Sequence, residues 1–425
     1  MKVDKAGILV FLLLLGSILQ AQKINSPYSR YGLGKLSGEN INTPIKAMGG
    51  ISIGYASPQV INPGNPASYA VFDSTAFLFQ VGLFGNITTH KTLYQSESSN
   101  FATLNYIFIG FPVTKWWRSA LGILPFSKLG YDVKVVVPLE YFSNVTNDIS
   151  GDGGLNRFFW GNAFKLTENL RLGIDATYLF GQAKRSSVLS FPDSVLILRT
   201  NAESKSRGSD FIFDYGLQYD LHLKNERLLT LGLIYSNTFY LKAKQEYIVY
   251  TTSGGYGTNV PVIKDTVLYQ PEEKGLVILP DRVGAGFTLQ QPGEWLIGAD
   301  FEWQNWERFE SFGRRDSLDN AWRVSLGGQF IPNHSSISPL PLRMSYRVGF
   351  RYENSYLNLF GNEINEYGIS FGFGFPMKKS RTTLDLTFEF GSRGTTNDNL
   401  IKENFVNVTF GVAIFEHWFH KRKYR

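Results

Sequence analysis

The stretch TLDLTFEFG, at residues 383–391, carries a leucine or phenylalanine at every second position, with acidic or threonine side chains between them. Successive side chains of a β-strand point to opposite faces, so this period of two predicts a strand with one apolar and one polar face. The stretch NVTFGVAIF, at 407–415, repeats the pattern. The alternation decides the fold class, because it predicts a sheet and not a set of helices.

The same alternation recurs along the chain, and turn-forming residues separate the repeats. It predicts about fourteen strands, at residues 74–89, 100–111, 119–137, 155–166, 169–185, 210–222, 228–249, 281–290, 294–306, 321–331, 342–353, 364–376, 381–391 and 404–415. The predicted connections tend to alternate between long (138–154, 186–209, 250–280, 307–320, 392–403) and short (167–169, 292–294). Long loops at one end and short turns at the other are typical of an outer-membrane barrel.

A closed ring is the arrangement that lets such a sheet cross a membrane. An unpaired backbone group is costly in hydrocarbon, so only a ladder of strands without edges is stable there. We therefore predict an all-β fold, an antiparallel transmembrane β-barrel of about fourteen strands. The alternative is a secreted soluble β-sandwich or solenoid, whose strands would also bury one face and hydrate the other.

The N-terminus has the layout of a secretory signal peptide. MKVDKAGILVFLLLLGSILQAQ combines a charged start, an apolar run at residues 6–15 and a small residue at Ala21, where we expect cleavage. The chain contains no cysteine, which excludes a disulfide framework and any thiolate site. Its formal net charge of +6 is modest for 425 residues and gives no support to nucleic-acid binding. We predict an exported protein of the outer membrane of a Gram-negative bacterium.

The polar faces of the predicted strands would line the lumen, and several of them carry charge. Arg343, Arg347 and Arg351 alternate along one predicted strand, and Asp385 and Glu389 lie two strands further on. Between them runs GISFGFGF, whose inward positions are mainly glycine and serine. We expect the five charges to line the lumen and the small residues to leave room there for another part of the chain.

The segment between the signal peptide and the first strand, residues 22–73, does not alternate. Its stretch QVINPGNPASYA, at 59–70, holds two Asn-Pro pairs. Proline donates no backbone hydrogen bond and pushes the preceding residue out of the helical region, so the stretch suits neither a helix interior nor a paired strand. A plug inside the barrel needs no ladder bonds, and asparagine side chains supply the bonds that its backbone lacks.

Two short motifs of this segment, AMGG at 47–50 and NPASYA at 65–70, resemble the N-terminal signature of the long-chain fatty acid transporter family (FadL/TodX). LPDRVGAGFTL and GEWLIGADFEWQNWERF resemble the late hairpin of that family, and the C-terminal stretch resembles that of its members from the Bacteroidota. The resemblance implies fourteen strands and a hatch folded inside the barrel, whose motif would comprise Gly49, Gly50, Asn65, Pro66 and Ala67.

The stretch ILPFSKLGYDV, at 123–133, places Pro125 and Gly130 inside the third predicted strand. A proline breaks a ladder bond in a closed barrel, and a glycine often marks a bend. In the family that the chain resembles, an interruption of this strand opens a lateral path, and the resemblance implies a gate here. The alternative is a hairpin turn at 125–130.

Residues that would support catalysis are not grouped in the sequence. The five histidines fall at predicted strand ends, in turns or in the tail, without the serine and carboxylate that acyl transfer requires. We therefore predict no enzyme activity, no cofactor and no metal site. We expect passive transport of fatty-acid-like or aromatic molecules, with apolar residues of the predicted loops 186–209 and 250–280 as a capture site.

The partners that this interpretation names are outer-membrane lipid and a hydrophobic small-molecule ligand. The alternative function is a protein-binding outer-membrane component of a Bacteroidota secretion system, with other envelope proteins as partners. Under either function we divide the chain into a signal peptide at 1–21, a plug at 22–73, a barrel at 74–415 and a basic periplasmic tail at 416–425.

Overall fold

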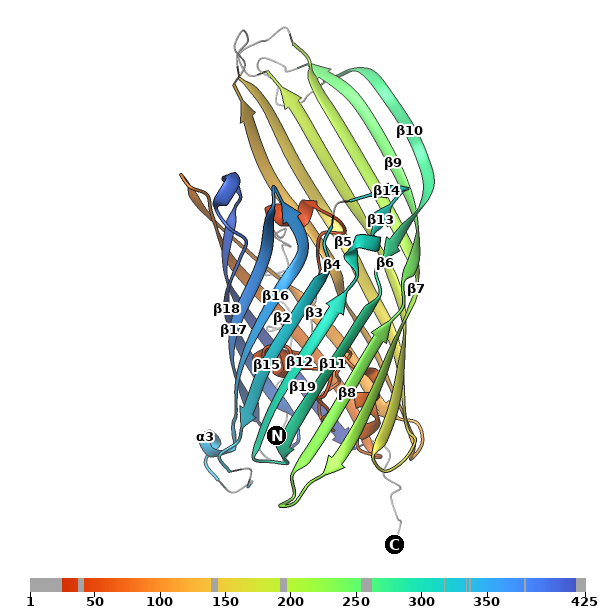
Figure 1. The fold of residues 1–425 in the computed structure, drawn as a ribbon, viewed down its shortest axis with the longest axis vertical. Coiled ribbons are helices and arrows are strands. Elements are labelled where there is room, and N and C mark those ends of the chain that lie inside the picture. Colours follow the sequence, from red (N-terminus) through yellow and green to blue (C-terminus); the bar gives the residue numbers. More distant parts are fainter. Residues whose placement is uncertain are drawn as a thin grey trace, which may run out of the picture.

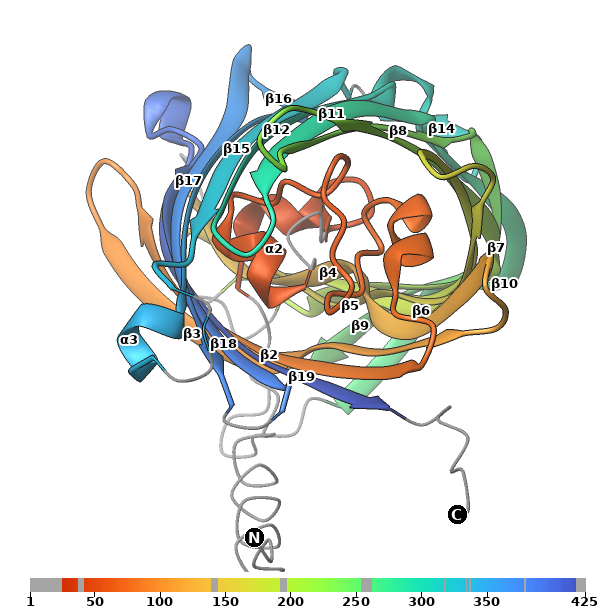
Figure 2. The same ribbon diagram turned by 90° about the horizontal axis from the view of Figure 1, so that it is seen from below.

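The computed structural model describes residues 25–36, 42–138, 144–191, 197–253, 262–316, 318–333, 335, 338–377 and 380–417. Its main element is a ring of antiparallel strands that encloses the N-terminal segment (Figures 1 and 2). The predicted signal peptide and all but the first two residues of the predicted tail lie outside the described residues.

The wall is formed by β2 (Ala76–Lys91), β3 (Ser96–Pro112), β4 (Trp117–Val137), β5 (Val145–Lys165), β6 (Leu170–Ser190), β7 (Arg199–His222), β8 (Leu228–Ser236), β9 (Phe239–Ser253), β10 (Val262–Leu279), β11 (Arg282–Gln291), β12 (Trp295–Gln304), β15 (Ala321–Phe330), β16 (Ser345–Leu359), β17 (Asn362–Pro376), β18 (Thr383–Arg393) and β19 (Lys402–His417). β8 and β9 follow one another along the same line of the wall, as do β10 and β11, so each of these two pairs counts as one barrel strand. The described chain therefore forms a barrel of 14 strands. The ring closes where β19 pairs with β2 along the whole length of β2. The predicted closed barrel is confirmed.

Smaller elements lie inside or beside the wall. The plug contains η1 (Pro27–Arg30), β1 (Lys35–Leu36), α2 (Thr43–Ala47) and η2 (Pro66–Val71), and Figure 2 shows it within the ring. Between wall strands lie η3 (Trp306–Arg308), β13 (Glu310–Ser311), β14 (Arg314–Arg315), α3 (Leu340–Arg343) and η4 (Asn397–Asn399). None of the helices in the described ranges has the length and apolarity needed to cross a bilayer.

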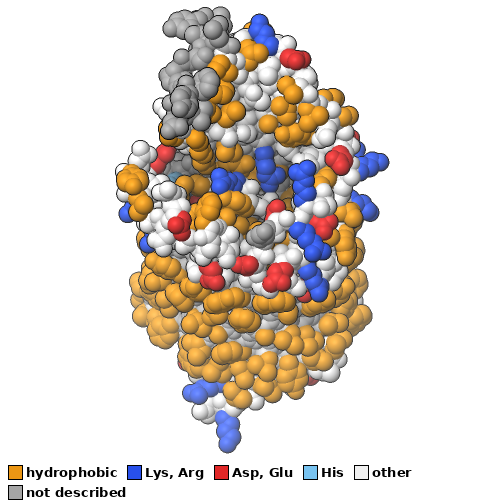
Figure 3. All heavy atoms as spheres, turned by 45° about the horizontal axis from the view of Figure 1, so that its top comes forward, with side chains coloured by type: hydrophobic (Ala, Val, Ile, Leu, Met, Phe, Trp, Pro, Cys, Tyr) orange, Lys and Arg blue, Asp and Glu red, His pale blue; other side chains and the backbone are white. Residues whose placement is uncertain are grey.

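The outward-facing side chains form an apolar belt around the barrel. Figure 3 shows this belt below a zone in which charged side chains gather. Its members are exposed large hydrophobic residues from successive strands, among them Leu233, Phe287, Ile297, Leu326 and Phe371. Such a band of side chains is what hydrocarbon requires of a barrel surface.

One side of the barrel rises far above the belt. We call this part the crest, formed by residues 131–137, 145–152, 183–190, 199–208, 243–253 and 262–274 of β4, β5, β6, β7, β9 and β10 (Figure 1). The prediction of long loops at 138–154, 186–209 and 250–280 is therefore wrong, because most of these residues extend the strands. Above a membrane both faces of a sheet are wet, so polar residues occupy both faces and the alternation that marks a strand disappears.

Candidate functional site

The two Asn-Pro pairs shape the plug through their asparagine side chains. Asn65 Oδ1 accepts a hydrogen bond from the Ala67 N–H at 3.1 Å, and Asn65 Nδ2 donates to the Ile53 carbonyl at 2.7 Å. Asn62 Nδ2 donates to the Ser52 carbonyl at 2.7 Å. Asn65 thereby caps η2, whose first residue is Pro66. The side chains supply bonds that a proline-rich backbone lacks.

Gly49 and Gly50 end helix α2 with positive φ angles of 68° and 88°. The Gly50 N–H donates to the Ile45 carbonyl at 3.0 Å, which closes the last turn. The Gly49 N–H donates to Ser370 Oγ on β17 at 3.1 Å. The glycine pair thus both terminates the helix and fastens it to the wall.

The plug lies against a set of wall glycines, which we call the glycine seam. A Cβ atom added to any of these would lie between 1.9 and 2.3 Å from a plug atom: Gly173, Gly216, Gly232, Gly327, Gly349 and Gly372. Most of the opposing plug atoms belong to the backbone, so no side-chain rotation would relieve the overlap. The plug is therefore seated as closely as the interior of a folded domain.

Four of the predicted lumen charges form ion pairs along the inner face of the barrel wall. Arg347 Nη1 lies 2.6 Å from Asp385 Oδ1, and Arg351 Nε lies 2.6 Å from Glu389 Oε1. Both pairs lie over glycines of β17. A Cβ at Gly368 would lie 2.6 Å from Glu389 Oε1, and a Cβ at Gly374 would lie 2.9 Å from Asp385 Oδ1. Part of the room left by the small residues is therefore taken by ion pairs, and the plug takes another part.

Arg343 is placed differently from the other predicted lumen arginines. It ends α3, after Pro339 and Pro341, and strand β16 begins only at Ser345. The prolines favour a short turn of helix at this position over a paired strand. Arg343 lines a chamber of about 1100 Å³ below the plug, at the end of the barrel with the short turns.

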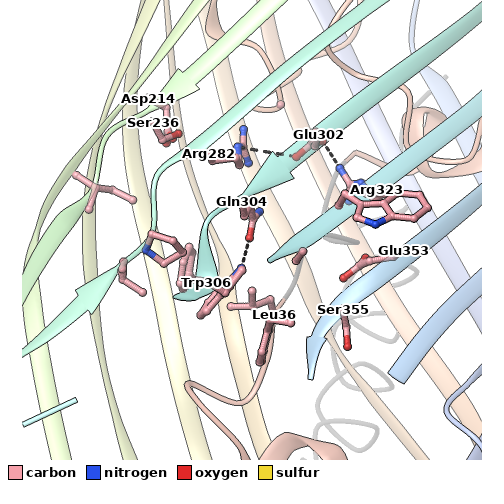
Figure 4. Close-up of a pocket in the computed structure, with 18 of the residues that line it drawn as sticks. Leu36, Asp214, Ser236, Arg282, Glu302, Gln304, Trp306, Arg323, Glu353 and Ser355 are labelled. Atoms are coloured by element: carbon pink, nitrogen blue, oxygen red, sulfur yellow. Dashed lines mark hydrogen bonds and ion pairs between the residues drawn. The ribbon is translucent and has the colours of Figure 1, made fainter. Parts of the chain in front are cut away.

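A second cavity, of about 170 Å³, lies on the other side of the plug, toward the crest (Figure 4). Its apolar lining residues include Leu36, Phe126, Ile212, Phe213, Phe239, Leu279, Trp306 and Trp322. Its charged lining residues include Arg157, Asp214, Arg282, Glu302, Arg323 and Glu353. The cavity combines apolar walls with a few convergent polar groups, as ligand pockets commonly do.

The polar side chains of this cavity hold one another in place. Glu302 forms an ion pair with Arg323 and lies 3.9 Å from Arg282 Nε (Figure 4). Trp306 Nε1 donates to Gln304 Oε1 at 2.6 Å. Compensating pairs of this kind keep buried charges stable and leave the aromatic faces for apolar contacts.

The cavity adjoins an interruption of the wall between β3 and β4. β3 pairs with β4 only from Ile107↔Ile123 to Pro112↔Arg118, and above that level β3 pairs with β2 alone. Pro125 lies two residues beyond Ile123, the last β4 residue paired with β3, and lines the cavity. β4 continues to Val137, so the alternative of a hairpin turn at 125–130 is wrong.

The plug occupies part of the free edge that β4 presents above the interruption. Lys35 and Leu36 of β1 pair with Lys128 and Ser127, and the Ser26 N–H donates to the Gly130 carbonyl at 2.8 Å. The sequence predicted Pro125 and Gly130 on one strand, and both lie on β4. The structure also shows that the plug bonds to the backbone of Gly130. No sequence pattern indicated that β1 would meet this edge.

The described residues of the apolar capture site predicted in the loops at 186–209 and 250–280 line neither cavity. Leu189 pairs with Thr200 in the crest, and Val262 and Val267 are exposed on β10. Val195, Leu196, Tyr256 and Val260 lie outside the described residues. Within the described ranges, no three His, Asp or Glu side chains are grouped in a way that would hold a metal ion.

The model of the BamG family matches residues 3–425. Several solved structures share the fold. The Ralstonia pickettii toluene transporter TbuX is 13% identical in sequence, with 89% of this chain and 99% of that chain covered and a TM-score of 0.58. The monoaromatic hydrocarbon channel CymD is 13% identical, with 91% of this chain and 100% of that chain covered and a TM-score of 0.55. A Pseudomonas aeruginosa FadL homologue is 14% identical, with 89% of this chain and 98% of that chain covered and a TM-score of 0.58. Among curated proteins, none matches the sequence.

Proposed function

The chain belongs to the BamG family, and from this premise we propose that it is a Gram-negative outer-membrane barrel that passes hydrophobic small molecules sideways into the membrane. The molecule enters the cavity above the plug and leaves through the interruption between β3 and β4. The plug stays seated during passage, because the glycine seam leaves it no space to slide. The transporters and channels that share the fold support the ligand class.

The observation that carries the proposal is the position of the wall interruption. The β3–β4 ladder ends at Ile123, and Pro125 and Phe126 line the cavity immediately above it. Phe126 is the extra residue of a bulge, because Pro125 pairs with Asn156 on β5 and Ser127 pairs with Leu155. Proline and bulge together keep the edge of β4 from extending its ladder toward β3.

Replacement of Pro125 by valine tests the exit. Valine restores a backbone N–H that favours closure of the ladder by about 1 kcal/mol, so we expect uptake to fall about fivefold. Uptake of radiolabelled toluene and oleate is measured in cells whose own outer-membrane transporters have been deleted. Pro376→Val is the control, because Pro376 lies at the short-turn end, where β17 and β18 are continuously paired. Unchanged uptake in Pro125→Val contradicts the proposed exit.

A second candidate function, binding of another envelope protein, is favoured by the crest. Ile263, Val267 and Tyr269 on β10 are 61%, 63% and 54% exposed, well away from the belt. A channel that releases its ligand into the membrane has no need of apolar side chains in this position, and exposed apolar groups often mark a contact surface.

Site-specific photo-crosslinking in intact cells tests this second function. We expect a crosslinker at Val267 to capture one discrete envelope protein, and a crosslinker at Tyr94 in the β2–β3 turn to capture none. Tyr94 is 87% exposed at the same end of the barrel and serves as the matched control. No adduct at Val267, or equal adducts at both positions, contradicts protein binding by the crest.

A further inference from the structure

The wall has a second interruption, between β7 and the strand made by β8 and β9. β7 pairs with β9 as far as Gly208↔Ala243, and with β8 from Asp214↔Ser236 onward. Between these points residues 209–213 of β7 face residues 237–242, and no register joins them. On its other side β7 stays paired with β6 throughout this level.

The cavity above the plug borders this interruption. It is lined by Ile212 and also by Phe213, the next residue along β7. Consecutive residues of a strand point to opposite faces, so one of the two must face outward. Phe213 does so, with 42% of its surface exposed. Asn237 and Phe239 line the cavity from the opposite lip.

The surroundings of the interruption suit contact with lipid. Phe211 and Tyr240 flank it on the outside and are each 56% exposed. Directly below it, Ser236 donates a hydrogen bond to Asp214. Near its upper end, Lys242 Nζ lies 3.8 Å from Asp210 Oδ2 across the unpaired stretch. The apolar lips therefore lie between these two polar contacts. Backbone groups without ladder partners are tolerated at membrane depth only where they line a cavity or are buried in protein.

We propose that this interruption is a second lateral port, which admits the alkyl chain of an amphiphile from the outer leaflet into the cavity. The lips formed by Ile212, Phe213 and Phe239 are apolar, and Arg282 and Glu302 further inside would meet a polar head group. The port goes beyond the proposed function, which uses the β3–β4 interruption alone. With both ports the cavity has two openings to the same membrane, and the four strands β4 to β7 stand between them.

Single thiols test the port directly, because the chain contains no cysteine. Ile212→Cys and Phe239→Cys place a thiol on either lip. Gln304→Cys is the matched control, because Gln304 lines the same cavity but is paired with Arg282 on one side and Ala321 on the other. Each variant, reconstituted in phospholipid vesicles, is labelled with an octyl maleimide that partitions into the bilayer, and separately with a small charged maleimide from water.

The quantity measured is the labelling rate from the bilayer divided by the rate from water, which cancels differences in thiol reactivity. We expect this ratio to be about tenfold higher for either lip variant than for Gln304→Cys, because an alkyl chain concentrates the reagent in the lipid. Equal ratios, or a higher ratio at Gln304→Cys, overturn the port. If one lip variant does not fold, the other is judged by the same criterion. Uptake that is insensitive to Pro125→Val refutes the proposed exit but leaves this ratio unchanged, so the two failures are distinguishable.

Discussion

Substitution of Gly349 by alanine tests whether the plug is a fixed part of the barrel. The added Cβ would lie 1.9 Å from the Gly49 nitrogen and 2.2 Å from the Met48 carbonyl carbon. Ordinary packing separates such atoms by about 3.5 Å, so wall and plug would have to move apart by about 1.5 Å. Both contacts are backbone atoms that cannot rotate away, and we expect a loss of about 1–3 kcal/mol in plug stability.

The matched control is Gly85→Ala. Gly85 is also a wall glycine, but the nearest heavy atom to its added Cβ is the Val408 carbonyl oxygen at 3.8 Å, an ordinary contact. Hydrogen exchange of residues 42–72 is followed in detergent, and the heat-dependent gel shift of the barrel reports that the wall remains closed. We expect about 5-fold to 150-fold faster exchange of the plug in Gly349→Ala and no change in Gly85→Ala. Equal exchange in the two variants refutes the idea that the seam holds the plug.

Three further outcomes are expected. Asn65→Ala removes the side chain that caps η2 by bonding the Ala67 N–H, and it should lower plug stability by about 1–2 kcal/mol. The same hydrogen-exchange experiment measures this loss, and unchanged protection of the plug amides would contradict the capping role. Burial raises the pKa of Tyr28 from 10.0 to about 12. The neutral phenol therefore contributes fully to the free energy of unfolding below pH 10, and this contribution is lost as the pH rises through 12. Tyr28→Phe should abolish that alkaline loss of stability in urea unfolding measured at a series of pH values, and a loss that persists unchanged would show another cause. Glu389→Gln leaves Arg351 with less compensating charge and should cost about 3 kcal/mol in urea unfolding, whereas a cost near zero would show that this ion pair is dispensable.

The membrane-embedded part of the fold could be predicted from the sequence because hydrocarbon imposes a strict rule: every side chain that faces lipid must be apolar. In TLDLTFEFG each outward residue is apolar, and β18 (Thr383–Arg393) begins at the same residue as the quoted stretch. Above the belt this rule ends. Residues 199–208 continue β7 as the polar run RTNAESKSRG, which contains no alternation by which a strand could be recognised.

The plug could be placed from its turn-forming residues, but its contacts with the wall could not. Gly232 and Gly349 lie on strands far apart in sequence, and only the closed ring brings both against the same segment. The second interruption was missed for a similar reason. Asn237 and Thr238 lie within a stretch predicted as one strand at 228–249, and the sequence YSNTFY gives only a weak polar signal there.

The close fit between the glycine seam and the plug also constrains the order of assembly. Plug residues 42–72 lead almost directly into β2, and β2 is the strand that bonds to the last strand, β19. A segment whose backbone touches the wall on several sides cannot be threaded into a barrel that has already closed. The N-terminal segment must therefore be in position before β19 meets β2, so that during biogenesis it serves as the template around which the wall is wrapped.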